Sequence, residues 1–197
     1  ENQNNSVRIQ LDRERALFIR CTDKNIDAPR HFYNENEPIE IEGLWKIGFI
    51  EGGPVYPGDI STQNLKSWTE MGDQETRRFA GTARYSIEFD WENANSHAFL
   101  NLGDVMDCAH VYLNGKDFGS LLGPVYELKV DNLNHGKNEL VVEVTNIAAN
   151  RIRDLDRREV DWKKFHDINF VNIDYEPFDA SQWPVKEAGL LGPVTLN

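Results

Sequence analysis

The stretch Ala109-His110-Val111-Tyr112-Leu113-Asn114-Gly115 contains the pattern that decides the fold. Apolar side chains at every second position alternate with His110 and Tyr112, which is typical of a strand with one dry face. The Asn114-Gly115 dipeptide follows at once. It is a strong short-range hairpin signal, because both central residues of a type I′ turn need a positive φ. We therefore expect a half-buried strand that ends in a tight hairpin.

The same alternation recurs along much of the chain. Three further rows of apolar residues are predicted to share an inward face: Tyr85, Ile87 and Phe89; Tyr126, Leu128 and Val130; and Leu140, Val142 and Val144. Short strands separated by turns are typical of a sandwich or a barrel, and one wet and one dry face per strand suits a two-sheet sandwich. The sequence has no strand–helix–strand rhythm, which argues against a parallel α/β sheet. We predict an all-β, antiparallel sandwich.

Composition and charge narrow the classes of partner. The chain has 197 residues, of which 40% are hydrophobic, enough to bury a core. Lys and Arg number 21 against 33 Asp and Glu, for a net charge of -12. This charge repels phosphate backbones and anionic lipids, so we expect neither nucleic acid nor membrane as a partner. Neutral ligands such as sugars stay open. A disulfide between Cys21 and Cys108 also stays open, because their spacing decides nothing.

A series of short motifs in a particular order resembles a known family. The motifs are Gly43-Leu44-Trp45-Lys46-Ile47, Phe79-Ala80-Gly81-Thr82-Ala83-Arg84-Tyr85, Leu102-Gly103-Asp104-Val105, the Ala109 to Gly115 stretch, Gly123-Pro124-Val125-Tyr126, Gly136-Lys137-Asn138-Glu139-Leu140, Val144-Thr145-Asn146 and Gly189-Leu190-Leu191-Gly192-Pro193-Val194-Thr195-Leu196. Together they resemble the galactose-binding-like jelly-roll domain of family 2 glycoside hydrolases. The series is more similar still to the C-terminal sandwich of family 106 α-L-rhamnosidases.

The resemblance implies an organisation and a function. Residues 38–197 would form the galactose-binding-like jelly roll, and residues 1–37 would be strands and a connection from the end of a preceding region, packed on the sandwich. The chain would be a non-catalytic accessory domain of a secreted or periplasmic glycoside hydrolase. Its partners would be carbohydrate and the catalytic domain of the same polypeptide. Two alternatives are an autonomous carbohydrate-binding module and a complete small hydrolase.

The candidate carbohydrate contacts lie in the long connection between residues 146 and 188. Trp183 offers a face on which a sugar ring can stack, while Asp179 and Glu187 can accept hydrogen bonds from sugar hydroxyls. Asn150 and Arg151 form a second candidate pair. For Trp183 the alternative is a plug in the end of the sandwich. For Asn150 it is a structural amide that holds a loop, with Arg151 paired to a nearby acid.

Catalytic and metal sites are not indicated by the sequence. A glycosidase needs two carboxylates at about 5 to 9.5 Å, and in the families resembled these lie on a separate barrel, so no catalytic residue is assigned. Four acids crowd one segment: Asp154, Asp156, Glu159 and Asp161. Arginines alternate with them, so we interpret the segment as a salt-bridged surface and assign no metal ligand or cofactor. A structural calcium ion elsewhere stays open.

Overall fold

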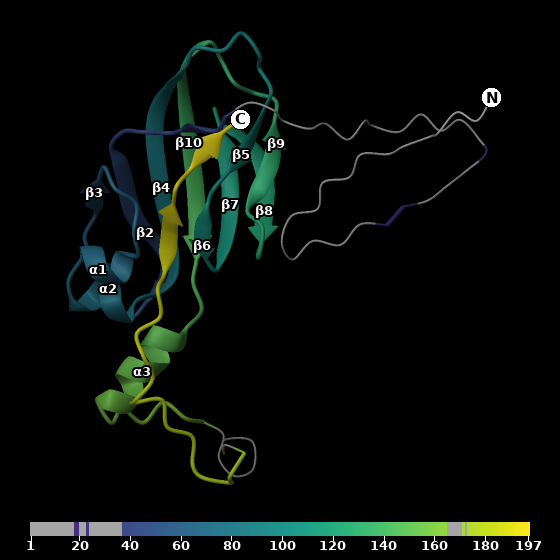
Figure 1. Ribbon diagram of the computed structural model, residues 1–197. Helices are drawn as coiled ribbons and strands as arrows, with labels where there is room; N and C mark the ends of the chain where they lie inside the picture. Colours follow the sequence, from purple (N-terminus) through teal and green to yellow (C-terminus); the bar gives the residue numbers. More distant parts are fainter. Residues whose placement is uncertain (1–17, 20–22, 24–36, 165–170, 172) are drawn as a thin grey trace. The chain divides into compact units, whose positions relative to one another are not determined.

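The computed structural model of the protein describes residues 18–19, 23, 37–164, 171 and 173–197 (Figure 1). By its contacts the chain divides into two units, Glu1–Glu35 and Asn36–Asn197, and the description below concerns the second. Almost all of the predicted 1–37 region, including Cys21, falls outside the described residues. The domain boundary predicted near residue 37 therefore stays a prediction, and so does the alternative of a disulfide between Cys21 and Cys108.

The larger sheet has six strands, and it contains the hairpin that the sequence predicts. Its order is β3-β2-β4-β10-β7-β8. The strands are β2 (Trp45–Gly53), β3 (Ile60–Thr62), β4 (Ala80–Trp91), β7 (Cys108–Leu113), β8 (Lys116–Leu122) and β10 (Gly136–Thr145). All pairs in it are antiparallel. Asn114 and Gly115, with φ of 50° and 75°, form the turn between β7 and β8.

The second layer is smaller and lies across the core from the first (Figure 1). It has the order β1-β12-β5-β9, and a separate pair joins β11 to β6. These strands are β1 (Ile39–Glu40), β5 (Ala98–Asn101), β6 (Asp104–Met106), β9 (Glu127–Val130), β11 (Gly189–Gly192) and β12 (Thr195–Leu196). Of the described residues 44% are in strands and 11% in helices. The predicted all-β antiparallel sandwich is confirmed.

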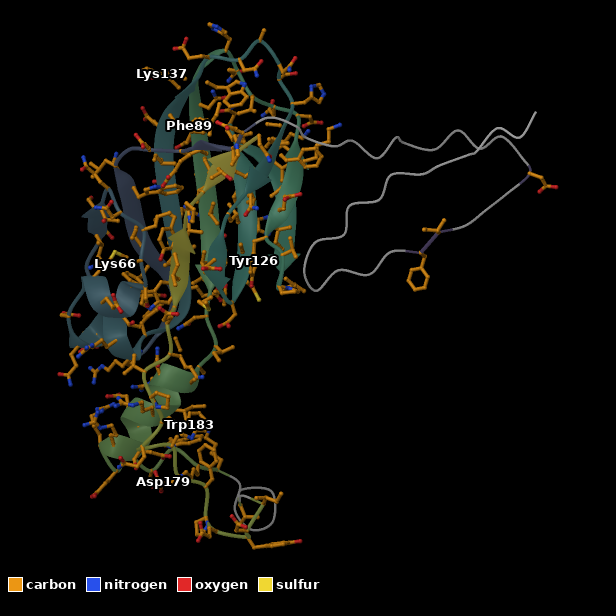
Figure 2. All side chains as sticks on the ribbon, viewed as in Figure 1. Lys66, Phe89, Tyr126, Lys137, Asp179 and Trp183 are labelled. Carbon is orange, nitrogen blue, oxygen red and sulfur yellow. The ribbon has the colours of Figure 1, made fainter. Side chains whose placement is uncertain are left out.

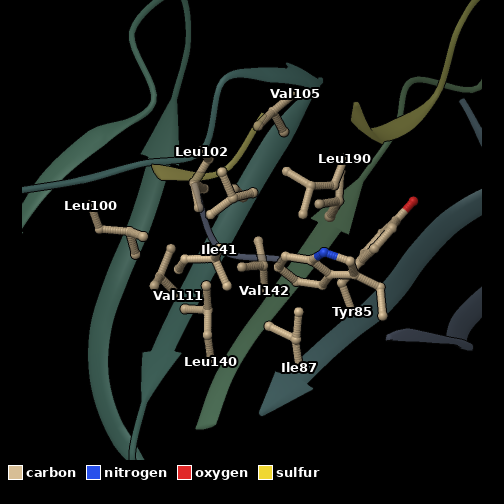
Figure 3. Packing of buried hydrophobic residues seen from close by; sticks show 14 of the residues in the cluster. Ile41, Tyr85, Ile87, Leu100, Leu102, Val105, Val111, Leu140, Val142 and Leu190 are labelled. Carbon is tan, nitrogen blue, oxygen red and sulfur yellow. The ribbon is translucent and has the colours of Figure 1, made fainter. Parts of the chain in front are cut away.

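The core is built from the inward rows that the alternation predicts. Val142 on β10 lies between Val111 on β7 and Tyr85 on β4 in the register of the sheet. All six residues predicted to share a core are at most 1% exposed: Ala109, Val111, Leu113, Leu140, Val142 and Val144. Figure 3 shows side chains of the second layer, among them Leu100, Leu102 and Leu190, closing over these rows. The inward faces of the strands are therefore filled by protein side chains.

Among the residues that the structure describes, three short helices lie at one end of the sandwich. Helices α1 (Trp68–Met71) and α2 (Gln74–Arg78) precede β4, and α3 (Ala149–Arg157) follows β10 (Figure 1). Helix α1 includes Trp68, and α3 lies in the long 146–188 connection, for which the sequence predicts no helix. Within the described ranges, no helix is long and apolar enough to cross a bilayer.

Candidate functional site

Helix α3 is stabilised by the arginines and aspartates that alternate along it. Asp154 accepts hydrogen bonds from Arg158, four residues later, and from Arg151, three residues earlier, at 2.7 and 3.1 Å. Pairs at these spacings face each other on a helix surface. Arg78 from α2 approaches the same carboxylate to 3.7 Å and so links the two helices. The interpretation of this segment as a salt-bridged surface is consistent with these contacts.

Asn150 ties α3 to the returning chain. Its amide nitrogen donates to the carbonyl oxygen of Lys186 at 2.7 Å, and its amide oxygen accepts from the N–H of Lys186 at 2.8 Å. The side chain is buried, with 4% of the residue exposed. Such a closed pair of bonds uses the groups with which an asparagine would hold a sugar. Here Asn150 positions the connection, and Arg151 is paired to Asp154, as the structural alternative supposed.

Asp156 is the second point at which α3 holds the connection. One carboxylate oxygen accepts the N–H of Ala180 at 2.7 Å, and the other accepts the indole N–H of Trp162 at 2.6 Å. The ammonium of Lys163 lies 3.2 Å from the same carboxylate, whose side chain is 6% exposed. Burial acts to raise the pKa of Asp156, but these three donors outweigh it and the pKa is lowered. Asp156 therefore stays ionised at neutral pH and clamps both limbs of the connection.

Trp183 lies at the surface, in a turn held by its neighbours. The backbone N–H of Trp183 donates to the carbonyl oxygen of Ala180 at 3.0 Å. The backbone carbonyl oxygen of Trp183 accepts from the Nε of Arg153 in α3 at 2.6 Å. The indole packs edge-on against Phe178, with ring centroids 5.6 Å apart, and 38% of the residue is exposed. Trp183 is thus not the fully buried plug that was the alternative. Part of its ring surface is accessible.

Asp179 lies in the same turn as Trp183, at the α3 end of the domain (Figure 2). Its carboxylate accepts from the N–H and hydroxyl of Ser181 at 2.7 and 3.0 Å, and the residue remains exposed. Glu187 is also exposed, one residue before the buried Ala188 that leads into β11. The structure brings Asp179 and Trp183 together in one turn. It shows no contact between Glu187 and either of them.

A cavity of about 600 Å³ opens beside this turn. It is lined by Asp179, Ser181 and Gln182 from the returning chain and, from the outgoing chain, by Asp156, Arg157, Glu159, Val160, Asp161, Trp162 and Lys163. An aromatic wall with carboxylates and amides around it is the chemistry of a sugar site. Trp162 and Asp156 are not among the site residues that the sequence predicts. The alternating charges of residues 151–158 indicate a salt-bridged surface, but not which distant residues it would contact.

A Ser–His–Asp contact lies elsewhere, on the outer face of the six-stranded sheet. The two ring nitrogens of His110 lie 2.8 Å from the Ser120 hydroxyl and 2.8 Å from Asp117. The order of contacts resembles that of a hydrolase triad. The Asp117 side chain is 59% exposed, however, and accepts from the N–H of Gly119, as a turn residue would. This network is a cross-strand surface contact, and we give it no catalytic role.

In the described part of the chain, no group of three or more His, Cys, Asp or Glu side chains is placed to hold a metal ion. The carboxylates of Asp154 and Asp156 are engaged by arginines, a lysine, the indole of Trp162 and a backbone N–H group instead.

Comparison with known proteins gives the context of this fold. The chain is 32% identical over 189 residues to a Formosa agariphila protein named "Putative beta-glucuronidase", which covers 82% of this chain but 16% of that protein. A rhamnosidase from Novosphingobium sp. PP1Y superimposes with a TM-score of 0.63 and 26% identity, over 87% of this chain and 16% of that one. The chain matches an accessory domain of glycoside hydrolases.

These relatives are much longer than this chain. The domain spans 16% of the length of both proteins, so it corresponds to one domain of a much larger multidomain chain. A beta-glucuronidase from an uncultured Clostridium species is also similar, with a TM-score of 0.47 over 62% of this chain. No family model matches the sequence.

Proposed function

We propose that this accessory domain belongs to an α-L-rhamnosidase-like glycoside hydrolase, supports the catalytic domain of the same polypeptide and contributes a carbohydrate contact through residues 146–188. The similarity to a rhamnosidase over 87% of this chain supports the choice of enzyme. The inward faces of the strands are already used by the core, which leaves the connections for binding. The longest of these is the one that α3 holds.

The observation that carries the proposal is the accessible Trp183 in the turn with Asp179. A partly exposed tryptophan beside a carboxylate can stack on the apolar face of a sugar ring. The carboxylate can then accept hydrogen bonds from the hydroxyl groups of that sugar. Asp179 also lines the neighbouring cavity with Trp162. Glu187 would extend the contact toward β11. In this assignment Asn150 and Arg151 position the connection and do not touch the sugar.

We expect the parent enzyme to lie outside the cytoplasm and this chain alone to have no glycosidase activity. A polysaccharide-degrading enzyme meets its substrate outside the cytoplasm, so we place the parent protein in the periplasm or outside the cell. The catalytic carboxylates would come from another domain. The purified chain should then release no nitrophenol from an aryl α-L-rhamnoside. Release that scales with the protein through purification, and that a single carboxylate substitution abolishes, would contradict this.

The decisive experiment measures kcat and KM of the full-length parent enzyme on a rhamnose-containing oligosaccharide. Trp183→Ala should raise KM about tenfold, since loss of one stacking contact costs roughly 1 to 1.5 kcal/mol. Tyr112→Ala, which removes an aromatic ring from the outer face of β7, is the matched control and should leave both constants unchanged. Equal constants for Trp183→Ala and the unaltered enzyme, with both folded, would refute the assigned contact.

A further inference from the structure

A second cavity, of about 760 Å³, lies between helices α1 and α2 on one side and α3 on the other. Five arginines line it, Arg77, Arg78, Arg153, Arg157 and Arg158, against three carboxylates, Glu70, Asp73 and Asp154. The cavity is therefore locally basic in a chain of net charge -12. This cluster of positive charge is opposite in sign to the net charge of the chain, so the overall composition does not account for it.

Two of the three carboxylates are already engaged. Asp73 accepts the N–H groups of Glu75 and Thr76 as the N-cap of α2. Asp154 is shared by Arg78, Arg151 and Arg158. The local acids are thus used within the protein, and they neutralise only some of the surrounding arginines.

Three arginines of this cavity lack an acidic partner. Within the described residues, no carboxylate lies at salt-bridge distance from Arg77, Arg153 or Arg157. The Nε of Arg77 donates to the carbonyl oxygen of Thr69 at 3.3 Å, and that of Arg153 to the carbonyl oxygen of Trp183 at 2.6 Å. These bonds orient two guanidinium groups and leave their terminal nitrogens available. We call Arg77, Arg153 and Arg157 the arginine trio.

The trio is also close together. Arg153 and Arg157 are four residues apart on α3 and so share one helix face, and α2, which carries Arg77, packs against α3. Burial lowers the pKa of Arg153, the charges of Arg157 and Arg77 lower it further, and the charge of Asp154 offsets only part of this effect. Like charges gathered in this way destabilise one another, and a bound anion would relieve the repulsion. Guanidinium groups are suited to carboxylate and sulfate because they offer paired N–H donors.

We propose that the arginine trio binds an acidic sugar, one that carries a carboxylate or a sulfate ester, within the glycan that this domain contacts. The inference rests on the proposed function and specifies its ligand. Arg157 lines both this cavity and the cavity beside Asp179, so one oligosaccharide can reach both. Its hydroxyl-rich unit would lie by Trp162 and Asp179, and its acidic unit by the trio. The overall negative charge disfavours nucleic acid as the source of the anion.

The test is calorimetric titration of the 197-residue chain with a galacturonate tetramer, its methyl ester and a sulfated galactose oligosaccharide. The tetramer or the sulfated sugar should bind at least about tenfold more tightly than the uncharged ester, and physiological salt should weaken that binding. Whichever of the two binds more tightly identifies the anionic group. Equal affinity for acid and ester would overturn the inference.

Variants at Arg157 test the trio directly, because this side chain makes no ion pair within the described residues on which folding would depend. Arg157→Gln should weaken binding of the acidic sugar about tenfold. Arg157→Lys should retain part of the affinity, because it keeps the charge but loses the paired donors. Arg84→Gln, at the salt bridge with Glu143 on the outer sheet, is the matched control and should change nothing. Unaltered binding by a folded Arg157→Gln variant would overturn the inference.

Two further outcomes separate this inference from the proposal on which it rests. Tighter binding of an oligo-aspartate peptide than of either acidic sugar would show that the cavity receives an acidic protein segment, and the inference would be wrong. The proposed function is tested separately, by Trp183→Ala in the parent enzyme. A sugar contact that depends on Trp183 but not on Arg157 would leave the proposed function standing and remove only the acidic ligand.

Discussion

Asn150 and Lys186 are joined by two reciprocal hydrogen bonds, of 2.7 and 2.8 Å, between the amide of Asn150 and the backbone of Lys186. Asn150 lies in the first turn of helix α3, near the start of the 146–188 connection, and Lys186 lies near its end, shortly before β11. The Asn150 amide donates one hydrogen bond to the Lys186 backbone and accepts one from it, as a neighbouring strand would. These two bonds close the long loop at its base. The candidate site beyond it, with Trp183 and Asp179, can therefore be positioned by a rigid part of the domain.

We predict that Asn150→Ala lowers the free energy of unfolding by about 1 to 3 kcal/mol. The substitution removes a buried amide and leaves the backbone N–H and carbonyl group of Lys186 without their partner. Asn95→Ala is the matched control, since Asn95 is exposed, and it should change the stability by less than about 0.5 kcal/mol. The measurement is urea denaturation of the three proteins. Equal midpoints for Asn150→Ala and Asn95→Ala would show that the reciprocal bonds contribute little.

The sandwich could be predicted from the sequence because its information is local. The alternation around Val111 and Val142 involves only residues that are neighbours in the chain, and so does the turn at Asn114-Gly115. The alternation then predicts which face of each strand is buried. Helix α3 was missed because its residues are mostly charged and its stability comes from pairs such as Asp154–Arg158 and from contacts with α2. The arginine trio could not be predicted at all, since Arg77 meets α3 only through the tertiary fold.

The candidate site was predicted in part for the same reason. Asp179 and Trp183 are neighbours in one turn, so their joint position could be read from the sequence. The pairing of Asp156 with Ala180 and Trp162, by contrast, joins segments whose approach depends on the path of the whole connection. Asn150 resembled a ligand-binding residue in the sequence, but its position in the fold commits both amide groups to Lys186.

We predict that Val111→Ala costs about 1 to 3 kcal/mol of stability. Val111 is completely buried between β10 and β8 in the six-stranded sheet, so the lost methyl groups leave a gap that rigid strands cannot close. Val55→Ala removes the same atoms from a residue that is 54% exposed, and it should be nearly neutral. Chemical denaturation of both variants checks the difference. A loss of only a few tenths for Val111→Ala would mean that the register of β7 is wrong.

We predict that Gly81→Ala is more damaging than an alanine at an open glycine. A Cβ on Gly81 would lie 2.0 Å from the carbonyl oxygen of Glu51 on β2, where the two strands approach closely. Because the obstacle is backbone, β2 and β4 would have to separate, at a cost of more than about 2 kcal/mol. Gly58→Ala, with open space around the added carbon, is the control and should leave the melting temperature nearly unchanged. Similar melting temperatures for the two variants would contradict the close approach of β2 and β4.

Asp156 should make the domain less stable in acid. Its folded-state pKa is lowered, since the donors from Ala180, Trp162 and Lys163 outweigh the effect of burial. A group whose pKa falls on folding contributes stability above its unfolded pKa, about 3.9 for an aspartate, and loses it as the pH falls through the folded value. Asp156→Asn removes the ionised form and should cost about 1 to 3 kcal/mol at pH 7.

The pH dependence distinguishes this ionic role from a simple packing role. The difference in unfolding free energy between the unaltered protein and Asp156→Asn should be largest near neutral pH. It should shrink as the pH falls from about 4 through the lowered folded-state pKa of Asp156, because both folded proteins then carry an uncharged group. Asp90→Asn makes the same chemical change at an exposed position and should produce only a small difference at either pH. Denaturant titrations of the three proteins at neutral and acidic pH supply the comparison. If the cost of Asp156→Asn were the same at both pH values, the carboxylate would act through its shape alone, and the clamp on the 146–188 connection would not depend on charge.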